Sequence, residues 1–217
     1  MLSSVPTAGI DVGKDFLDLG FHPAAKPLRC DNTPAGIRDL IALEKTRLKQ
    51  ALDPLVADSH RAVIDSLEAA CAEVETALDR RIAAAPDLAR KRTILTSIPG
   101  IGRRIATVLI TDMPELGAID RKAAASLAGM APHPTQSGRH PGRHAIAGGR
   151  PCLRTAFYMA GMVAARACPA FTAPYKAMRE AGKPAKVAIV ATGRRLVVLA
   201  NALVRDDKTF AESDVAN

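Results

Sequence analysis

The sequence predicts a mainly α protein, and three observations support that class. The chain is 48% hydrophobic but only 3% aromatic, with no tryptophan, so its core must come from Ala, Leu, Ile and Val. Ala and Leu are the strongest helix formers among these residues. Long segments repeat apolar residues at helical spacing, and prolines stand where such segments begin.

The first part of the chain is the exception. Residues 8–32 alternate apolar and polar positions in AGIDVG and DFLDLGF around a turn at Gly13-Lys14, and LRCDN is a candidate third strand. Pro34 then occupies the first position of a helix. Helical sequence continues to about residue 85, with a bend at Pro54 and an end at Pro86.

One stretch of this helical region has a seam. Apolar residues step by 3, 4, 3 and 4 positions, as in a heptad repeat: Ile64, Leu67, Cys71, Val74 and Leu78. The seam is either a dimer stripe, parallel or antiparallel, or the core face of a helical hairpin within one chain. The pattern alone leaves both interpretations open.

The remainder reads as a second helical unit. Helices are predicted over 88–97, 103–112, 121–129, 150–167, about 170–180 and 184–205. The glycine-rich stretch 132–149 is predicted to be a loop. The chain thus divides into residues 1–42 (β-hairpin and helix), 43–86 (coiled coil or helical hairpin) and 87–210 (a helical C-terminal domain).

Positive charge is concentrated in one region. The formal net charge is +8, and between Lys91 and Arg154 ten Lys or Arg face three acids, which accounts for +7 of it. Clustered cations are typical of phosphate binding, because their contacts release condensed counterions. The sequence therefore predicts a nucleic-acid partner.

Cellular setting follows from weaker signals. The four cysteines are widely spaced with no Cys-x-x-Cys pair, which favours reduced thiols over a zinc site or disulfides. No secretory signal is visible. The last apolar run is interrupted by Arg194-Arg195, so no membrane span is expected. We expect a soluble cytoplasmic protein without a membrane partner.

A turn of the form Ile98-Pro-Gly-Ile-Gly102 joins two predicted helices. Gly100 and Gly102 would let the backbone approach a phosphate, and amides at the start of the next helix would point toward it. Arg103 and Arg104 follow directly, where a helix dipole would favour acids. We interpret this as a helix-hairpin-helix that binds nucleic acid. The alternative is an ordinary tight helical hairpin.

Ser137 lies in the predicted loop among cationic and basic groups. Ser-Gly is usually just a turn, but this one is surrounded by three of the five histidines and by arginines: His133, Arg139, His140, Arg143, His144 and Arg150. A serine hydroxyl needs a base or metal to become a nucleophile, and attack on phosphorus needs cationic donors. The histidine spacing makes a zinc site a poor alternative.

Asp11 is a weaker candidate. Within Gly9-Ile-Asp-Val-Gly it would sit on the first strand, where a lone Asp is usually a surface residue. Ribonuclease-H-like nucleases also place their first metal carboxylate on such a strand.

These features, in this order, resemble the DEDD-type insertion-sequence transposases that use a serine nucleophile and an RNA bridge. The resemblance lies in GIDVGKDFLDLGF, SIPGIG, AASLAGMAPHPTQSGRHPGRHAIAGGR, FYMA and GKPAKVAIVATGRRLVVLANALVRD. It implies that residues 1–42 begin a RuvC-like (ribonuclease-H-like) domain, that Asp11 is the first Mg²⁺-binding carboxylate, and that Ser137 is the catalytic nucleophile. Gln136 stands where the family often has an acid. For Arg139, Arg143 and Arg150, nucleic-acid contact is expected.

The chain departs from the family by an absence. Family members carry a further stretch with a Glu and two more Asp of the metal site. That stretch is missing here, at a junction that lies between Arg38 and Arg47. Two-metal chemistry needs several carboxylates, and Asp11 alone does not hold two ions. The chain therefore reads as an internally deleted transposase for insertion-sequence DNA recombination, catalytically impaired or dependent on a full-length partner.

Two other functions remain open. The chain could be a non-catalytic nucleic-acid-binding and dimerising module that modulates an intact transposase, or a structural helical protein that binds acidic surfaces. The partners predicted by the resemblance are DNA, a structured guide RNA, and either a second copy or a full-length transposase, at the bacterial nucleoid.

Overall fold

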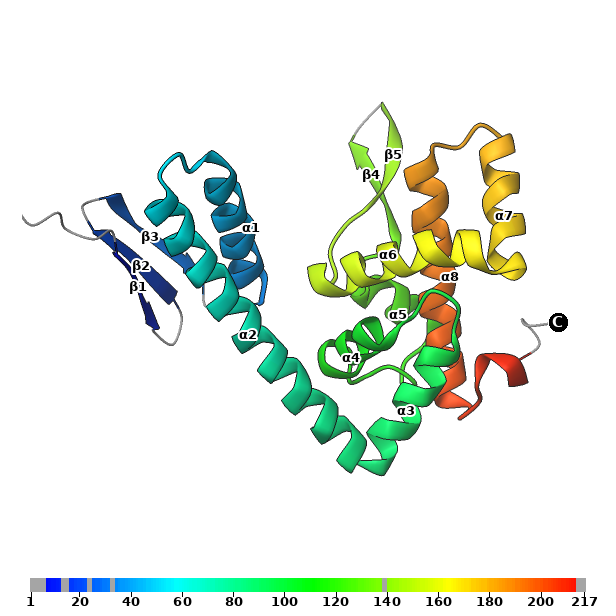
Figure 1. Ribbon diagram of the computed structural model, residues 1–217. Helices are drawn as coiled ribbons and strands as arrows, with labels where there is room; N and C mark the ends of the chain where they lie inside the picture. The colour runs from blue at the N-terminus through cyan, green and yellow to red at the C-terminus, as the bar shows by residue number, and fades with distance from the viewer. Residues whose placement is uncertain (1–6, 13–15, 23–24, 32–33, 138–139, 214–217) are drawn as a thin grey trace, which may run out of the picture. The chain divides into compact units, whose positions relative to one another are not determined.

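The computed structural model describes the chain except for residues 1–6, 13–15, 23–24, 32–33, 138–139 and 214–217 (Figure 1). The chain divides into two compact units, Met1–Ala77 and Leu78–Asn217. Most of the described residues lie in helices, so the predicted mainly α class is confirmed. The three-part division into 1–42, 43–86 and 87–210 stays a prediction.

The first unit combines a small sheet with two helices. Three antiparallel strands in the order β1-β2-β3 precede a helical pair, and their bounds are β1 Thr7–Val12, β2 Phe16–His22, β3 Ala25–Asp31, α1 Pro34–Gln50 and α2 Pro54–Ala84. The last turns of α2, from Leu78, belong to the second unit. Both helices begin at a proline, which lacks the N–H that a first helical turn leaves unused. The predicted third strand and the break at Pro54 are both present.

A compact apolar cluster holds this unit together. Leu17 of β2, Leu40 of α1 and Val63 of α2 are buried against one another. Beside them the Glu44 carboxylate is fully buried, with the Nδ1 of His60 2.5 Å from one oxygen and the Nη1 of Arg47 2.8 Å from the other. These contacts satisfy a charge that would otherwise be costly to bury, and they link α1 to α2.

The heptad seam of α2 has two environments. Ile64 is buried and Leu67 packs against the small cluster, so this half of the seam is the core face of a helical hairpin. Val74, one heptad after Leu67, is 61% exposed. Burial within the chain therefore accounts for the first half of the seam only.

The second unit is a helical bundle. Its elements are α3 Pro86–Ser97, α4 Arg103–Asp112, α5 Arg121–Leu127, β4 Pro132–Ser137, β5 His140–Ile146, α6 Pro151–Ala167, α7 Pro169–Glu180, α8 Ala185–Arg205 and the 3₁₀ turn Phe210–Glu212. All six predicted helices are present, with ends displaced by no more than a few residues. Proline again opens α3, α6 and α7.

The predicted loop over 132–149 is wrong, because most of it forms an antiparallel β-hairpin of β4 and β5. Its prolines and glycines suggest turns, yet the sheet has only two strands. Each strand therefore has an unpaired edge, where a proline without an N–H costs no ladder hydrogen bond. Figure 1 shows the hairpin as a twisted ribbon.

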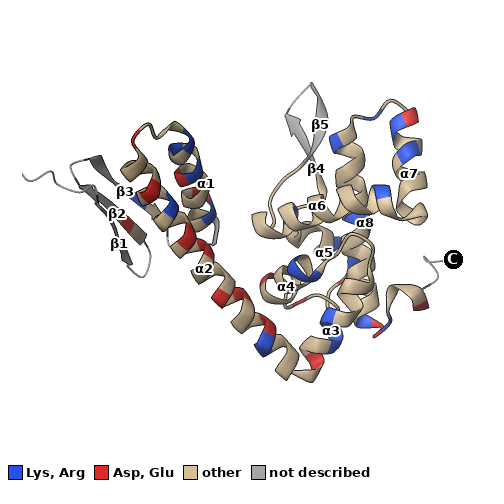
Figure 2. Ribbon diagram, in the orientation of Figure 1, with Lys and Arg blue, Asp and Glu red and all other residues tan. Residues whose placement is uncertain are grey.

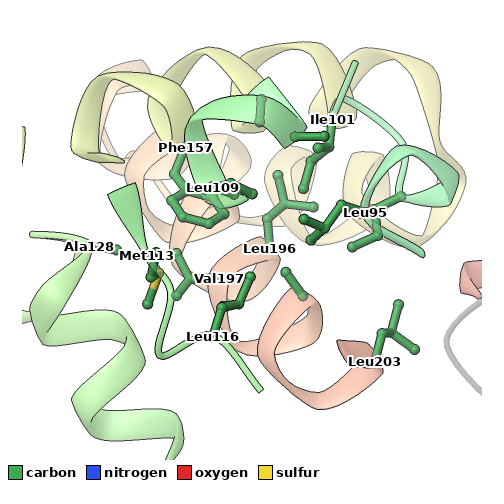
Figure 3. Close-up of a cluster of buried hydrophobic side chains, with 14 of the residues drawn as sticks. Leu95, Ile101, Leu109, Met113, Leu116, Ala128, Phe157, Leu196, Val197 and Leu203 are labelled. Carbon is green, nitrogen blue, oxygen red and sulfur yellow. The ribbon is translucent and has the colours of Figure 1, made fainter. Parts of the chain in front are cut away.

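The core of the second unit forms where α6 and α8 cross. Phe157 and Leu196 are fully buried there, together with Leu109 of α4 (Figure 3). At the crossing the two backbones nearly touch: a Cβ on Gly161 would lie 2.9 Å from the Gly193 nitrogen and from the Ile189 carbonyl oxygen. Small residues thus allow the two helices to pack without intervening side chains.

Among the described residues, one helix, α8, is long and apolar enough to cross a membrane by length and composition. The sequence-based expectation that Arg194-Arg195 rules out such a helix is therefore too strict. A core helix of a globular protein meets the same criteria, and α8 supplies core residues such as Leu196, Val197 and Ala200.

Replacing Gly161 by Ala should destabilise the second unit. Alanine normally favours a helix over glycine, but here its methyl group would force α6 away from α8. We expect a loss of about 1–3 kcal/mol in the free energy of unfolding, measured by urea denaturation. The control, Val163→Ala on the exposed side of α6, should change it by less than about 0.5 kcal/mol. Equal effects of the two changes would contradict this account of the crossing.

Candidate nucleic-acid interface

The turn between α3 and α4 is anchored by its two isoleucines. Ile98 and Ile101 are 1% and 2% exposed and belong to the core of the second unit. The amide of Ile101 donates to the carbonyl of Ile98 at 3.0 Å, which closes the turn. The apolar positions of the motif are thus packing positions, and Pro99 and Gly100 between them are partly buried.

The two glycines of this turn have different surroundings. Gly100 has φ +91°, a conformation that favours glycine, and a Cβ there would overlap the carbonyl oxygen of Ala160 on α6. Gly102 has φ −81° and ψ 175°, and a Cβ there would meet nothing within 4 Å. Close approach to a ligand is therefore open to Gly102, whereas Gly100 is required for packing against α6.

The start of α4 is suited to an anion. Gly102 is its N-cap residue and offers no side chain, and the first turn contains no acid. Its leading amides therefore have no side-chain acceptor from the cap, at the positive end of the helix dipole. Arg104 is exposed on this turn. Arg103 is also exposed, with its guanidinium 2.9 Å from the Asp79 carboxylate of α2.

Arg150 has an internal role that the sequence did not indicate. Its guanidinium binds both carboxylate oxygens of Glu115, at 2.6 and 3.0 Å, and the carbonyl oxygen of Asp112 at 2.6 Å. Its backbone amide donates to the carbonyl of Leu127. Arg150 therefore fixes the start of α6 to the segment after α4. The hydrogen bond from Arg150 lowers the pKa of Glu115 to about 2.

The β4–β5 hairpin carries the proposed nucleophile. Ser137 is the last residue of β4 and pairs in register with His140 of β5, while Arg143 pairs with Thr135. The strands thus bring Ser137 and His140 to opposite positions at the end of the hairpin. Arg139 lies outside the described residues.

The base of the hairpin is anchored to the helical core. The backbones of Gly129 and Gly149 touch, so a Cβ on Gly149 would overlap the Gly129 nitrogen. Met130, at the start of the hairpin, is fully buried, and its amide donates to the carbonyl of Ala125. The segment with Ser137 therefore leaves and rejoins the helical core at one point.

The structure describes the backbone of the strand that carries Asp11. Asp11 lies on β1 in register with Asp18 of β2, in the first unit. The carboxylate of Asp18 is held by Arg29, with both nitrogen–oxygen distances 2.6 Å, and this contact lowers the pKa of Asp18. No group of three or more His, Cys, Asp or Glu side chains gathers anywhere among the residues whose positions are described. The Asp11 side chain lies outside the described ones, so its role in binding Mg²⁺ stays a prediction.

Lysines and arginines also gather at a place that sequence reasoning missed. Figure 2 shows acidic residues spaced along α2 and basic residues on α5, α7 and α8. Four of these basic residues line a cavity of about 520 Å³: Arg121, Lys122, Arg194 and Arg195. The signal in the sequence is the double arginine inside an otherwise apolar helix, a pattern that was interpreted above only as an obstacle to membrane insertion.

The segment that contains the candidate interface is similar in sequence to known proteins. Residues 92–176 match the model of the transposase IS116/IS110/IS902 family. Over 129 residues, 58% of the chain, it is 33% identical to the pilin gene-inverting protein of Moraxella bovis, of which it covers 40%. Over 143 residues, 65% of the chain, it is 33% identical to the insertion element IS110 uncharacterized 43.6 kDa protein of Streptomyces coelicolor, of which it covers 35%.

The chain therefore spans less than half the length of these curated relatives. The family match includes both the turn at Gly102 and the hairpin with Ser137. In this part the chain is similar to the transposases of that family.

Glu115 should make the second unit sensitive to acid. Its folded-state pKa of about 2 lies below its ordinary value of 4.5, so its contribution is present above pH 4.5 and is lost as the pH falls toward 2. Glu115→Gln should lower the melting temperature at pH 7, and its difference from the wild type should shrink between about pH 4.5 and 2.

Thermal unfolding followed by circular dichroism at a series of pH values measures this difference. Glu180→Gln, at the exposed end of α7, is the control and should leave the curve unchanged. A difference that stays constant down to pH 2 would show that the ion pair with Arg150 does not carry the effect.

Proposed function

We propose that this chain is a DNA-binding protein of the insertion-element transposase family that does not cut DNA by itself. The observation that carries the proposal is the family match over residues 92–176, which includes both candidate contacts. The name of one relative refers to inversion of a gene and that of another to an insertion element. Both names concern rearrangement of DNA.

In this proposal the turn before α4 holds a phosphate without reading sequence. The Gly102 backbone allows close approach, the uncapped amides of α4 donate to phosphate oxygens, and Arg104 adds charge at the same turn. Such contacts depend on the phosphodiester backbone, so they tolerate any base sequence.

Ser137 is the proposed nucleophile of a strand-transfer reaction. Its hydroxyl is protonated at neutral pH and needs activation, which carboxylates with bound Mg²⁺ supply in phosphoryl transfer. The described residues of this chain do not assemble such carboxylates. We propose that a full-length relative supplies them when the two proteins act together.

A second candidate function is modulation of an intact transposase without chemistry. One observation favours it: Val74 leaves part of the α2 seam exposed for a partner helix. A second copy, or a full-length transposase, is the partner proposed for this seam. A structured guide RNA remains a proposal from the resemblance.

The phosphate contact at Gly102 can be tested by Gly102→Asn. Asparagine is a favourable N-cap residue, and its side-chain oxygen would accept from the α4 amides that are proposed to hold phosphate. We expect an equal or higher melting temperature together with duplex-DNA affinity lowered about fivefold, the effect of about 1 kcal/mol at a helix terminus.

Opposite movements of stability and affinity exclude misfolding as the cause. Gly100→Ala is the contrast, because its side chain would collide with α6 and should lower stability first. Unchanged DNA affinity in a stable Gly102→Asn protein would rule out this contact.

Cleavage can be tested with end-labelled DNA and Mg²⁺. The chain alone should bind the DNA but yield neither cut strands nor a covalent adduct, because the serine lacks activation. With a full-length relative present, an adduct to this chain should form and should disappear in Ser137→Ala. Strong adduct formation by the isolated chain would show that it has its own active site.

A further inference from the structure

The cavity lined by residues of α5, α7 and α8 combines four cations with apolar side chains. Arg121 and Lys122 are the first two residues of α5, and Arg194 and Arg195 lie in the middle of α8. Val198, Leu199 and Ala202 continue the α8 side, and the buried ring of Phe171 lies beneath Arg195, whose guanidinium carbon is 6.0 Å from the ring centre.

The four cations of this cavity form no salt bridge with another described residue, although the charges of Lys122 and Arg121 help to lower the pKa of nearby Asp120, after the backbone hydrogen bonds that it accepts. Among the residues that the structure describes, none of the four has a carboxylate within ion-pair distance. The nearest acid along the sequence, Asp120, uses its carboxylate to cap α5, accepting from the amides of Lys122 at 2.6 Å and Ala123 at 2.9 Å. Four like charges around one hollow repel one another unless an anion lies between them.

Other arginines of the same unit differ in this respect. Arg92 and Arg150 are held by Asp79 and Glu115 and serve packing. The cations around the cavity therefore represent charge that is left for an external ligand. Because all four are exposed, they are accessible to one.

The lining indicates which anion fits. A volume of about 520 Å³ exceeds what a single phosphate needs, and a bare phosphate would leave Val198, Leu199 and Ala202 without contact. A sugar–phosphate backbone supplies charge for the guanidinium groups and a largely apolar sugar for the lining. Ribose would place its 2′-hydroxyl against apolar side chains, where it costs free energy without a hydrogen-bond partner, whereas deoxyribose would not.

We propose that this cavity is a second DNA-backbone site, separate from the turn at Gly102, and that it favours DNA over RNA. The inference rests on the proposed function, because it assumes that the chain binds DNA. The Arg194–Arg195 pair and the Arg121–Lys122 pair hold phosphates from opposite sides, and the apolar lining contacts the deoxyribose between them.

The first test uses the salt dependence of duplex-DNA binding. Each phosphate contact contributes about 0.9 to the slope of log affinity against log salt concentration, so Arg194→Gln with Arg195→Gln should reduce the slope by about 1.8. The matched control, Lys176→Gln with Lys186→Gln, removes the same charge from exposed positions away from the cavity and should leave the slope nearly unchanged.

A second pair of variants guards against loss of folding. Arg121→Gln with Lys122→Gln removes the two charges contributed by α5 and should reduce the slope by the same amount. Arg194→Lys with Arg195→Lys keeps the two charges of α8 and should give a slope close to that of the wild type. The melting temperature of each protein is measured alongside.

The second test compares single-stranded DNA and RNA of one sequence. The wild type should bind the DNA more tightly than the RNA. The protein with Arg194→Gln and Arg195→Gln should lose most of that preference. An equal or greater loss of RNA affinity would overturn the site as a DNA site.

The outcomes also separate this inference from the proposed function. If the wild type binds no DNA, both fail. If it binds DNA and Gly102→Asn weakens binding, but the cavity variants match the lysine control, the second site alone is rejected.

Discussion

The near contact of the α6 and α8 backbones at Gly161 and Gly193 determines how the second unit is arranged. With no side chain between the helices, their remaining apolar faces close around Phe157 and Leu196. The same α6 backbone receives Gly100, at Ala160, so the turn before α4 is placed by the crossing as well. The outward position of Gly102 is thus a consequence of packing deeper in the core, and any ligand contact there depends on how α6 and α8 cross.

Local chemistry explains what could be predicted from the sequence, and contacts distant in sequence explain what could not. The proline at the first helical position predicted the start of α1 at Pro34, because that preference belongs to the residue itself. The role of Gly100 depends on Ala160, sixty residues later, and that of Arg150 on Glu115. The β4–β5 hairpin was missed because its prolines suggest turns unless the unpaired strand edges are known. Asp11 and Ser137 were selected by resemblance, and their chemistry stays a prediction.

Formal charge overstates the binding capacity of the basic region. Arg92, Arg103 and Arg150 all form salt bridges with carboxylates of their own chain. Part of the predicted positive charge is therefore neutralised within the folded protein. The converse holds for Arg194 and Arg195, which lie outside the region of highest charge density and yet form no salt bridge with any described residue. A count of lysines and arginines locates basic sequence, but the pairing of each guanidinium decides whether an anion can use it.

The contact between Gly129 and Gly149 brings the two ends of the hairpin segment together at one point of the core. A segment that departs from and returns to one point adds little to the topology of the core, and the helices on either side meet whether it is long or short. Its length and sequence can therefore vary between lineages with small effect on folding, while α5 and α6 keep their positions. In this arrangement the segment that carries the serine can diversify during evolution on a scaffold that need not change with it.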